Sequence, residues 1–152
     1  MKRILAIDPG ASGGFAWLDS NLSPHCRPMP QAEGDVISFL RHQSCLGFEL
    51  VVMEQVGGYI GGAGAPGSAM FNFGMNFGII KGAVQAFGMP LVTIYPQKWQ
   101  KALSLGSKKD YDKQWKNHLK ETAQRIFPSC DGITLKTADA LLILYYAEMV
   151  NP

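Results

Sequence analysis

Three acidic side chains stand at the boundaries of hydrophobic runs. Asp8 and Glu54 each end an apolar run, and Asp139 comes just before one. A carboxylate in such a place is costly unless it is paired with a positive charge or bound to a cation. Clustered carboxylate oxygens suit hard cations that keep several waters, such as Mg²⁺ or Mn²⁺. The three residues together therefore predict a divalent-metal site.

Each acid also has a simpler interpretation when it is taken alone. Asp8 could belong to an ordinary Asp-Pro-Gly turn. Glu54 could point into solvent from an edge strand, although the apolar run before it does not alternate. Asp139 could be a first-turn acid favoured by the helix dipole, with Thr137 as the cap. Three coincidences in the correct order of elements are harder to explain, so the joint pattern favours the metal site.

The charge of the chain is concentrated in one segment. The whole sequence has a net charge of +2. Residues 96–125 contain eight basic and three acidic residues, a net charge of +5, whereas the rest has six basic and nine acidic residues, a net charge of −3. Such asymmetry is typical of a polyanion-binding surface. A solvated helix face is the alternative explanation for the lysines.

The acids need a scaffold that brings them to one place. Apolar runs bounded by turn residues predict strands at 3–8, 13–18, 23–29, 49–56 and 91–95. Helical spacing predicts helices at 35–42, 68–87, 97–104, 111–127 and 137–149. Prolines assign the third strand to a sheet edge, and the glycine-rich residues 57–67 form a loop. The expected architecture is an α/β fold, a mixed sheet flanked by helices, in a single domain over residues 1–152.

The long predicted helix carries Gly74, Gly78 and Gly82 on one face. Glycine inside a helix costs about 1 kcal/mol relative to alanine. Close packing against another backbone would compensate for this cost. The partner could be the sheet of the same chain or a helix across a dimer axis.

Three stretches resemble the RuvC-type Holliday junction resolvases. They are the opening ILAIDPG with Ser12-Gly13-Gly14, the strand VVMEQ at residues 51–55, and ADALL at residues 138–142. The similarity covers nearly the whole chain and includes the segment PQKWQK at residues 96–101. It implies the ribonuclease H-like fold with a five-stranded mixed sheet. It also implies a homodimeric, structure-selective endonuclease that nicks four-way DNA junctions with Mg²⁺, and Mn²⁺ is expected to support the same reaction.

In this resemblance Asp8, Glu54 and Asp139 match the metal-binding acids. One position departs from the pattern: the family usually has Asp or His three residues before the last acid, and this chain has Lys136. A lysine ammonium is not a metal ligand at neutral pH. Lys136 could instead contact the scissile phosphate, or Asp131 could reach the site from its loop.

The remaining residues of interest are assigned to DNA. Ser12 and its neighbouring glycines would allow close approach of the backbone to DNA. Tyr59 could stack on an unpaired base at the junction centre. Phe71 and Phe73 could do the same, but they are expected in the helix core. Six lysines would bind phosphates and release counterions: Lys98, Lys101, Lys108, Lys109, Lys113 and Lys116.

Three other functions compete with this interpretation. One is a nuclease for branched DNA in general, including flaps and forks. Another is a junction-binding protein that has lost catalysis, which only Lys136 supports. The third, a sugar-kinase or actin-like ATPase, needs two lobes and a longer chain than 152 residues.

Composition limits the remaining classes. Hydrophobic residues make up 47% and charged residues 17% of the chain, which excludes an intrinsically disordered protein. No apolar stretch is long enough to span a bilayer, so we expect no membrane partner. Three cysteines without paired spacing fit a reducing compartment. The expected location is the cytoplasm of a bacterial or phage-infected cell.

Overall fold

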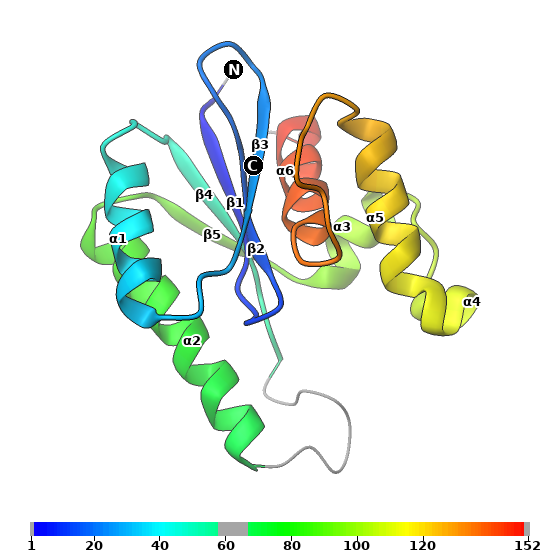
Figure 1. The fold of residues 1–152 in the computed structure, drawn as a ribbon, viewed down its shortest axis with the longest axis horizontal. Coiled ribbons are helices and arrows are strands. Elements are labelled where there is room, and N and C mark those ends of the chain that lie inside the picture. Colours follow the sequence, from blue (N-terminus) through cyan, green and yellow to red (C-terminus); the bar gives the residue numbers. More distant parts are fainter. Residues whose placement is uncertain (1, 58–66, 151–152) are drawn as a thin grey trace.

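The computed structural model describes residues 2–57 and 67–150, and its centre is a five-stranded sheet (Figure 1). The strands are β1 (Ile4–Asp8), β2 (Gly14–Leu18), β3 (Pro24–Pro28), β4 (Leu50–Glu54) and β5 (Leu91–Ile94). Their order across the sheet is β3-β2-β1-β4-β5. Strands β1 and β2 and strands β2 and β3 pair antiparallel, whereas β1 with β4 and β4 with β5 pair parallel. The predicted mixed sheet of five strands is confirmed.

Helices cover both faces of this sheet (Figure 1). On one face lie α1 (Glu33–Ser44) and α2 (Gly67–Ala86). On the other face lie α3 (Pro96–Ala102), α4 (Lys108–Tyr111), α5 (Trp115–Ile126) and α6 (Ala138–Val150). Helix α6 packs directly on β1, β2 and β4, and α3 and α5 pack on α6. The sheet therefore separates two hydrophobic cores.

The two cores follow from the alternation of side chains along the strands. In β1, Ile4 and Ala6 face α6, whereas Leu5 and Ile7 face α1 and α2. All four side chains are buried, as expected for a strand covered on both faces. Strand β3, which contains two prolines, lies at the sheet edge as predicted.

The basic helix expected at residues 111–127 is interrupted in the structure. Helix α4 begins earlier, because Ser107 and Asp110 form a capping box at its N-terminus. A 3₁₀ turn, η1 (Asp112–Gln114), then separates α4 from α5. Asp112 adopts a φ of 47°, which is incompatible with a continuous α-helix. The prediction of one helix was wrong because helical spacing does not reveal a change of chain direction.

The glycine face of α2 does not pack against the described residues of this chain. A Cβ built on Gly74, Gly78 or Gly82 would meet nothing within 4 Å among the described residues. Of the two expected partners, the sheet of the same chain is therefore ruled out for these glycines. Phe71 is 69% exposed, so its assignment to the core was also wrong. Within the described ranges, no helix has the length and hydrophobicity that crossing a membrane requires.

Candidate metal centre

Asp8 and Glu54 lie at the same edge of the sheet because β1 and β4 are parallel neighbours. Ile7 pairs in register with Met53, so the next residues of the two strands are Asp8 and Glu54. Both carboxylates therefore emerge side by side where the strands end, which is a common place for functional groups in parallel sheets. The sequence-based placement of these two acids is supported by this register.

The turn after β1 approaches the Asp8 side chain very closely. A Cβ on Gly13 would lie 2.7 Å from Asp8 Cγ and 2.3 Å from the Asp8 carbonyl oxygen. Real side chains do not tolerate such distances, so glycine is required here. The Gly13 amide donates to the Gly10 carbonyl at 2.8 Å, which closes the turn. Asp8 is thereby held against backbone on one side and remains open on the other.

Glu54 is fixed by a side chain from the first helix after β5. The Trp99 Nε1–H group donates to Glu54 Oε2 at 2.8 Å. Trp99 is fully buried in the core under α6, so its indole ring is held firmly. The carboxylate of Glu54 consequently has one oxygen engaged and the other available.

Asp139 reaches the same region from the first turn of α6. It is 6% exposed, and its Oδ1 is buried without a hydrogen-bond partner. Thr137 does not cap the helix with its hydroxyl as the simpler interpretation supposed. Its Oγ1 instead accepts from the Thr134 amide at 2.9 Å and donates to the Gly132 carbonyl at 3.1 Å. These hydrogen bonds stabilise the loop that leads into α6.

Lys116 is the direct partner of Asp139. Its Nζ donates to Asp139 Oδ2 at 2.5 Å, and the two side chains are 53% and 9% exposed. In the sequence this lysine was one of six assigned to DNA phosphates. The structure places its ammonium on a candidate metal-binding carboxylate instead, and its contact with DNA stays a prediction.

The three acids affect one another electrostatically. Burial, together with the charge of Asp139, raises the pKa of Asp8 from 3.8 to about 6. Burial and the charge of Asp8 raise the pKa of Glu54 from 4.5 to about 7, although the Trp99 hydrogen bond opposes the change. Desolvation and neighbouring negative charges both disfavour ionised carboxylates. The acids therefore share one electrostatic environment that a cation would stabilise.

The residues present suit a divalent cation, but they are not gathered around one. Within residues 2–57 and 67–150, no three His, Cys, Asp or Glu side chains are already close enough to hold a metal ion. The unpartnered Asp139 Oδ1 and the carboxylate donors nevertheless match the preference of Mg²⁺ for oxygen ligands. Binding would require the side chains of Asp8, Glu54 and Asp139 to move together.

The other lysines assigned to DNA all lie on the helical side that carries α6 (Figure 1). Lys98, Lys101, Lys108, Lys109 and Lys113 are exposed. Lys101 and Lys108 line an open groove between the end of α3 and the start of α4. These five lysines differ from Lys116 in that none of their ammonium groups pairs with a carboxylate among the described residues.

Four further predicted residues have different outcomes. Ser12 is exposed in the turn after Asp8, at the same sheet edge. Tyr59 lies outside the described residues. Lys136 is exposed, and within the described part of the chain its ammonium forms no ion pair with the acids. Phe73 is half-buried, and its ring would lie 3.6 Å from a Cβ on Gly10, so it supports the turn beside Asp8.

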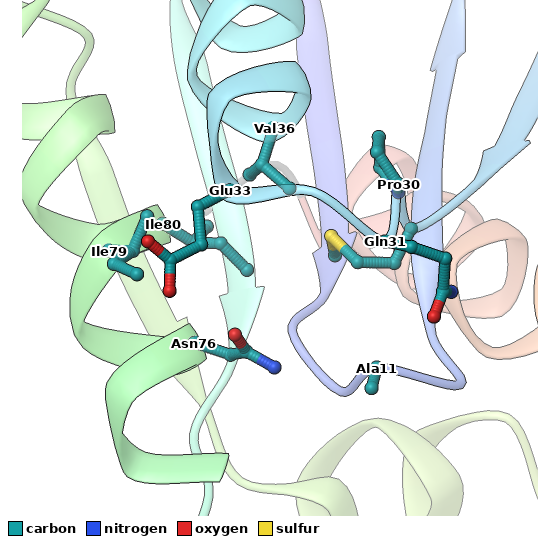
Figure 2. Close-up of a pocket in the computed structure, with 9 residues that line it drawn as sticks. Ala11, Pro30, Gln31, Glu33, Val36, Asn76, Ile79 and Ile80 are labelled. Carbon is teal, nitrogen blue, oxygen red and sulfur yellow. The ribbon is translucent and has the colours of Figure 1, made fainter. Parts of the chain in front are cut away.

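A small pocket lies next to this edge but does not contain the acids. Figure 2 shows it between the turn after β1, the segment leading into α1, and α2. Ala11, Glu33 and Asn76 are among its lining residues. None of Asp8, Glu54 and Asp139 lines it, so the pocket is separate from the candidate metal centre.

Comparison with solved structures gives the fold of the chain. The RuvC structure from Thermus thermophilus matches with a TM-score of 0.61 and 16% identity, over 98% of this chain and 96% of that one. This chain has the ribonuclease H-like fold of RuvC. T. thermophilus RuvC in complex with a Holliday junction substrate matches with a TM-score of 0.61 and 15% identity, over 97% and 96% of the two chains.

A weaker structural match is the yeast mitochondrial Holliday junction resolvase Ydc2. Its TM-score is 0.47 with 12% identity, over 99% of this chain and 81% of that chain. Neither the family models nor the curated proteins contain a match to this sequence.

The contacts that two residues make with the acids were not predicted from the sequence. Trp99 was noted only as part of a basic segment, and Lys116 only as one lysine among many. A tryptophan between lysines in a short helix indicates a buried face, which could have identified Trp99. No local pattern distinguishes Lys116 from its neighbours, because its partner is 23 residues away along the chain.

Proposed function

We propose that this protein is a metal-dependent endonuclease that cuts four-way DNA junctions. The supporting observation is that Asp8 and Glu54 lie side by side at the carboxyl edge of a RuvC-like sheet, where the charge of Asp139 acts on both, and that one buried Asp139 oxygen has no hydrogen-bond partner. The solved RuvC complex contains a Holliday junction substrate, which favours the same substrate class here.

Asp8, Glu54 and Asp139 would hold Mg²⁺ or Mn²⁺ in this proposal. A divalent cation held there would supply Lewis-acid activation of a water and charge stabilisation for the leaving oxygen of the phosphodiester. The chain itself orients the ligands: the turn at Gly13 confines Asp8, the indole of Trp99 fixes Glu54, and α6 directs Asp139. Raised carboxyl pKa values mean that cation binding also has to displace protons below neutral pH.

Exposed lysines would bind the arms of the junction. The five on α3, α4 and η1 belong to the segment with a net charge of +5. Contacts with phosphates release counterions and give salt-dependent affinity without sequence preference. Ser12 would contact DNA beside the acids, and Tyr59 would stack on an unpaired base. The exposed ring of Phe71 is available for the same purpose.

A homodimer is part of the proposal because a four-way junction must be cut twice. The exposed glycine face of α2, flanked by exposed Phe71 and Met75, is the surface offered to a second copy. Glycines allow close approach of two helices. The sheet of the same chain is ruled out as the partner of these glycines. Of the two partners expected from the sequence, a helix of the second subunit remains.

The direct test uses a synthetic four-way junction with Mg²⁺. The wild-type protein should convert it into paired nicked duplexes and leave linear duplex largely intact. Asp8→Asn keeps the shape of the side chain but removes its charge, so we expect at least about a 10³-fold loss of cleavage with junction binding retained. Full cleavage by Asp8→Asn would rule out the proposed site.

Substrate selectivity needs a separate measurement. A panel of flaps, forks and four-way junctions should be cut at different rates, with the four-way junction preferred. Equal rates on all of them would favour the general branched-DNA nuclease.

Lys136 is the residue that supports the alternative of a junction-binding protein without catalysis. If this position is a lost ligand site, Lys136→Asp should preserve or raise cleavage. A collapse of cleavage would assign Lys136 a role of its own at the scissile phosphate. A wild-type protein that binds junctions and never nicks them with Mg²⁺ or Mn²⁺ would favour a non-catalytic binding protein.

A further inference from the structure

Lys116 differs from the other lysines of the basic segment in what it touches. It is the second residue of α5, and its ammonium reaches across to Asp139 Oδ2 at 2.5 Å. Within residues 96–125, all of which the structure describes, it is the only lysine whose ammonium forms an ion pair with a carboxylate. Its partner is one of the three acids of the candidate centre, and that carboxylate is almost entirely buried.

The position of Lys116 is fixed by the start of α5. Trp115, directly before it, is buried in the core under α6. The ring of Tyr111 stacks on that of His118 with centroids 3.8 Å apart, and His118 Nε2 lies 2.9 Å from the Leu105 carbonyl oxygen. These contacts hold the first turn of α5, so the lysine is directed to the acids by packed structure.

The charge of Lys116 acts on the whole acidic cluster. Partial burial lowers the pKa of Lys116, but the charge and hydrogen bond of Asp139, together with the charges of Asp8 and Glu54, outweigh burial and raise this pKa above its ordinary value. The same ammonium lowers the pKa of Asp8 and Glu54. An opposite charge within a few ångströms favours the ionised forms of both partners.

We propose that the Lys116 ammonium is a built-in cation of the acidic cluster and takes the place of one divalent ion. The inference rests on the proposed metal centre formed by Asp8, Glu54 and Asp139. Three ionised carboxylates and one ammonium leave a charge that one divalent ion balances. Lys136, at the position where the RuvC-type resolvases usually have a further ligand, also leaves fewer donors for a second ion.

The consequence is measurable without any nuclease assay. Wild-type protein free of DNA should bind one Mn²⁺ per chain, as counted by calorimetry and by the electron paramagnetic resonance signal of free Mn²⁺. In Lys116→Met, Asp139 Oδ2 becomes available. This variant should bind a second Mn²⁺ or bind the first at least about ten-fold more tightly, because the metal no longer competes with the ammonium.

Removal of the lysine should also weaken the metal-free protein. In EDTA, Tm of Lys116→Met should fall by about 3 °C or more, since a buried carboxylate loses its partner. Excess Mn²⁺ should remove this difference. If Lys116→Met does not fold in EDTA, the double variant Lys116→Met/Asp139→Asn should fold, because neither charge remains.

The matched control is Lys120→Met, which makes the same change of charge one turn further along α5. This variant should keep the wild-type stoichiometry, affinity and Tm. Equal changes in both variants, no change in Lys116→Met, or a double variant that fails to recover would each overturn the inference. A protein that never cuts junctions but shows the predicted Mn²⁺ behaviour would instead retain this inference and lose the proposed nuclease function.

Discussion

Helices α2 and α6 are both rich in apolar residues but lie in opposite environments. Both are apolar around their whole circumference and almost free of charge. Helix α6 lies between the sheet and the α3 and α5 layer, and nine of its 13 residues are buried. Helix α2 has 20 residues, of which only Ile80 and Val84 are buried. The same kind of sequence thus builds the centre of the molecule in one case and an exposed surface in the other.

The difference predicts that α6 contributes mainly to the stability of the subunit and α2 to the proposed assembly. Helix α6 gains from burial against its own chain and carries Asp139 into the site. Helix α2 extends past the carboxyl end of β4 and leaves apolar side chains and glycines uncovered by the described residues (Figure 1). Exposed apolar surface of this kind is typical of an interaction site.

The largest expected effect is on the stability of the isolated chain. Leu142→Ala in α6 removes a fully buried side chain and should lower the free energy of unfolding by about 2–5 kcal/mol. Met75→Ala in α2 removes one that is 39% exposed and should change it by about 0.5 kcal/mol or less. Urea unfolding at low protein concentration measures both. Similar losses would contradict the contrast between the helices.

The next effect is the pH dependence of stability, which arises from the acids on the α6 side of the sheet. Asp8 and Glu54 have ordinary pKa values of 3.8 and 4.5, which folding raises to about 6 and about 7. The folded state therefore binds more protons between these values, and stability falls as pH rises from about 4 to about 7.

In EDTA, the wild-type protein should be less stable at pH 8 than at pH 5. The part due to Glu54 is on the order of 3 kcal/mol. Glu54→Gln cannot ionise, so its thermal unfolding should depend less steeply on pH. Parallel profiles of the two proteins would show that Glu54 does not titrate as described.

A smaller effect is expected for assembly through α2. Gly78→Leu adds a large side chain where the described residues leave open space, so the subunit should fold normally. The dissociation constant of the dimer, measured by analytical ultracentrifugation, should nevertheless rise at least about ten-fold, which corresponds to about 1.4 kcal/mol.

Two variants make the assembly test specific. Gly34→Leu in α1 makes the same substitution at another glycine with open space around it, and it should leave assembly unchanged. Gly78→Ala should stabilise an isolated subunit by about 1 kcal/mol, since alanine is the better helix former. Unchanged dimerisation in Gly78→Leu would exclude the glycine face as the interface.

The smallest expected effect is on the salt dependence of DNA binding, and it distinguishes the two faces of the sheet. Lys98→Ala in α3 should lower the slope of log affinity against log salt for junction binding by about 0.9, which corresponds to one phosphate contact. Lys81→Ala in α2 makes the same charge change on the other side of the sheet and should leave the slope unaltered. Equal slopes in the two variants would place DNA elsewhere.

Much of the fold could be predicted from local pattern. The five strands are short apolar runs closed by turn residues, and each was placed to within a few residues. The edge position of β3 followed from its prolines. The break between α4 and α5 was missed, because it depends on a positive φ at Asp112 that composition does not reveal.

For the candidate centre, the sequence singled out the three acids but not the side chains that contact them. Asp8, Glu54 and Asp139 contradict the hydrophobic runs beside them, and that conflict is visible in the sequence. Trp99 and Lys116 act through contacts that depend on how α3 and α5 pack on α6. Exposure of the glycines in α2 followed from only one of the two partners that the sequence left open, since an apolar helix normally indicates burial.

The three acids come from elements that are far apart in the chain. Asp8 ends the first strand, Glu54 the fourth, and Asp139 begins the last helix, so 131 residues separate the first acid from the third. Bringing residues so far apart in the chain into contact costs loop-closure entropy. A chain whose last helix has not docked has at most two of the acids in place. On the proposed function, such a chain cannot cut DNA.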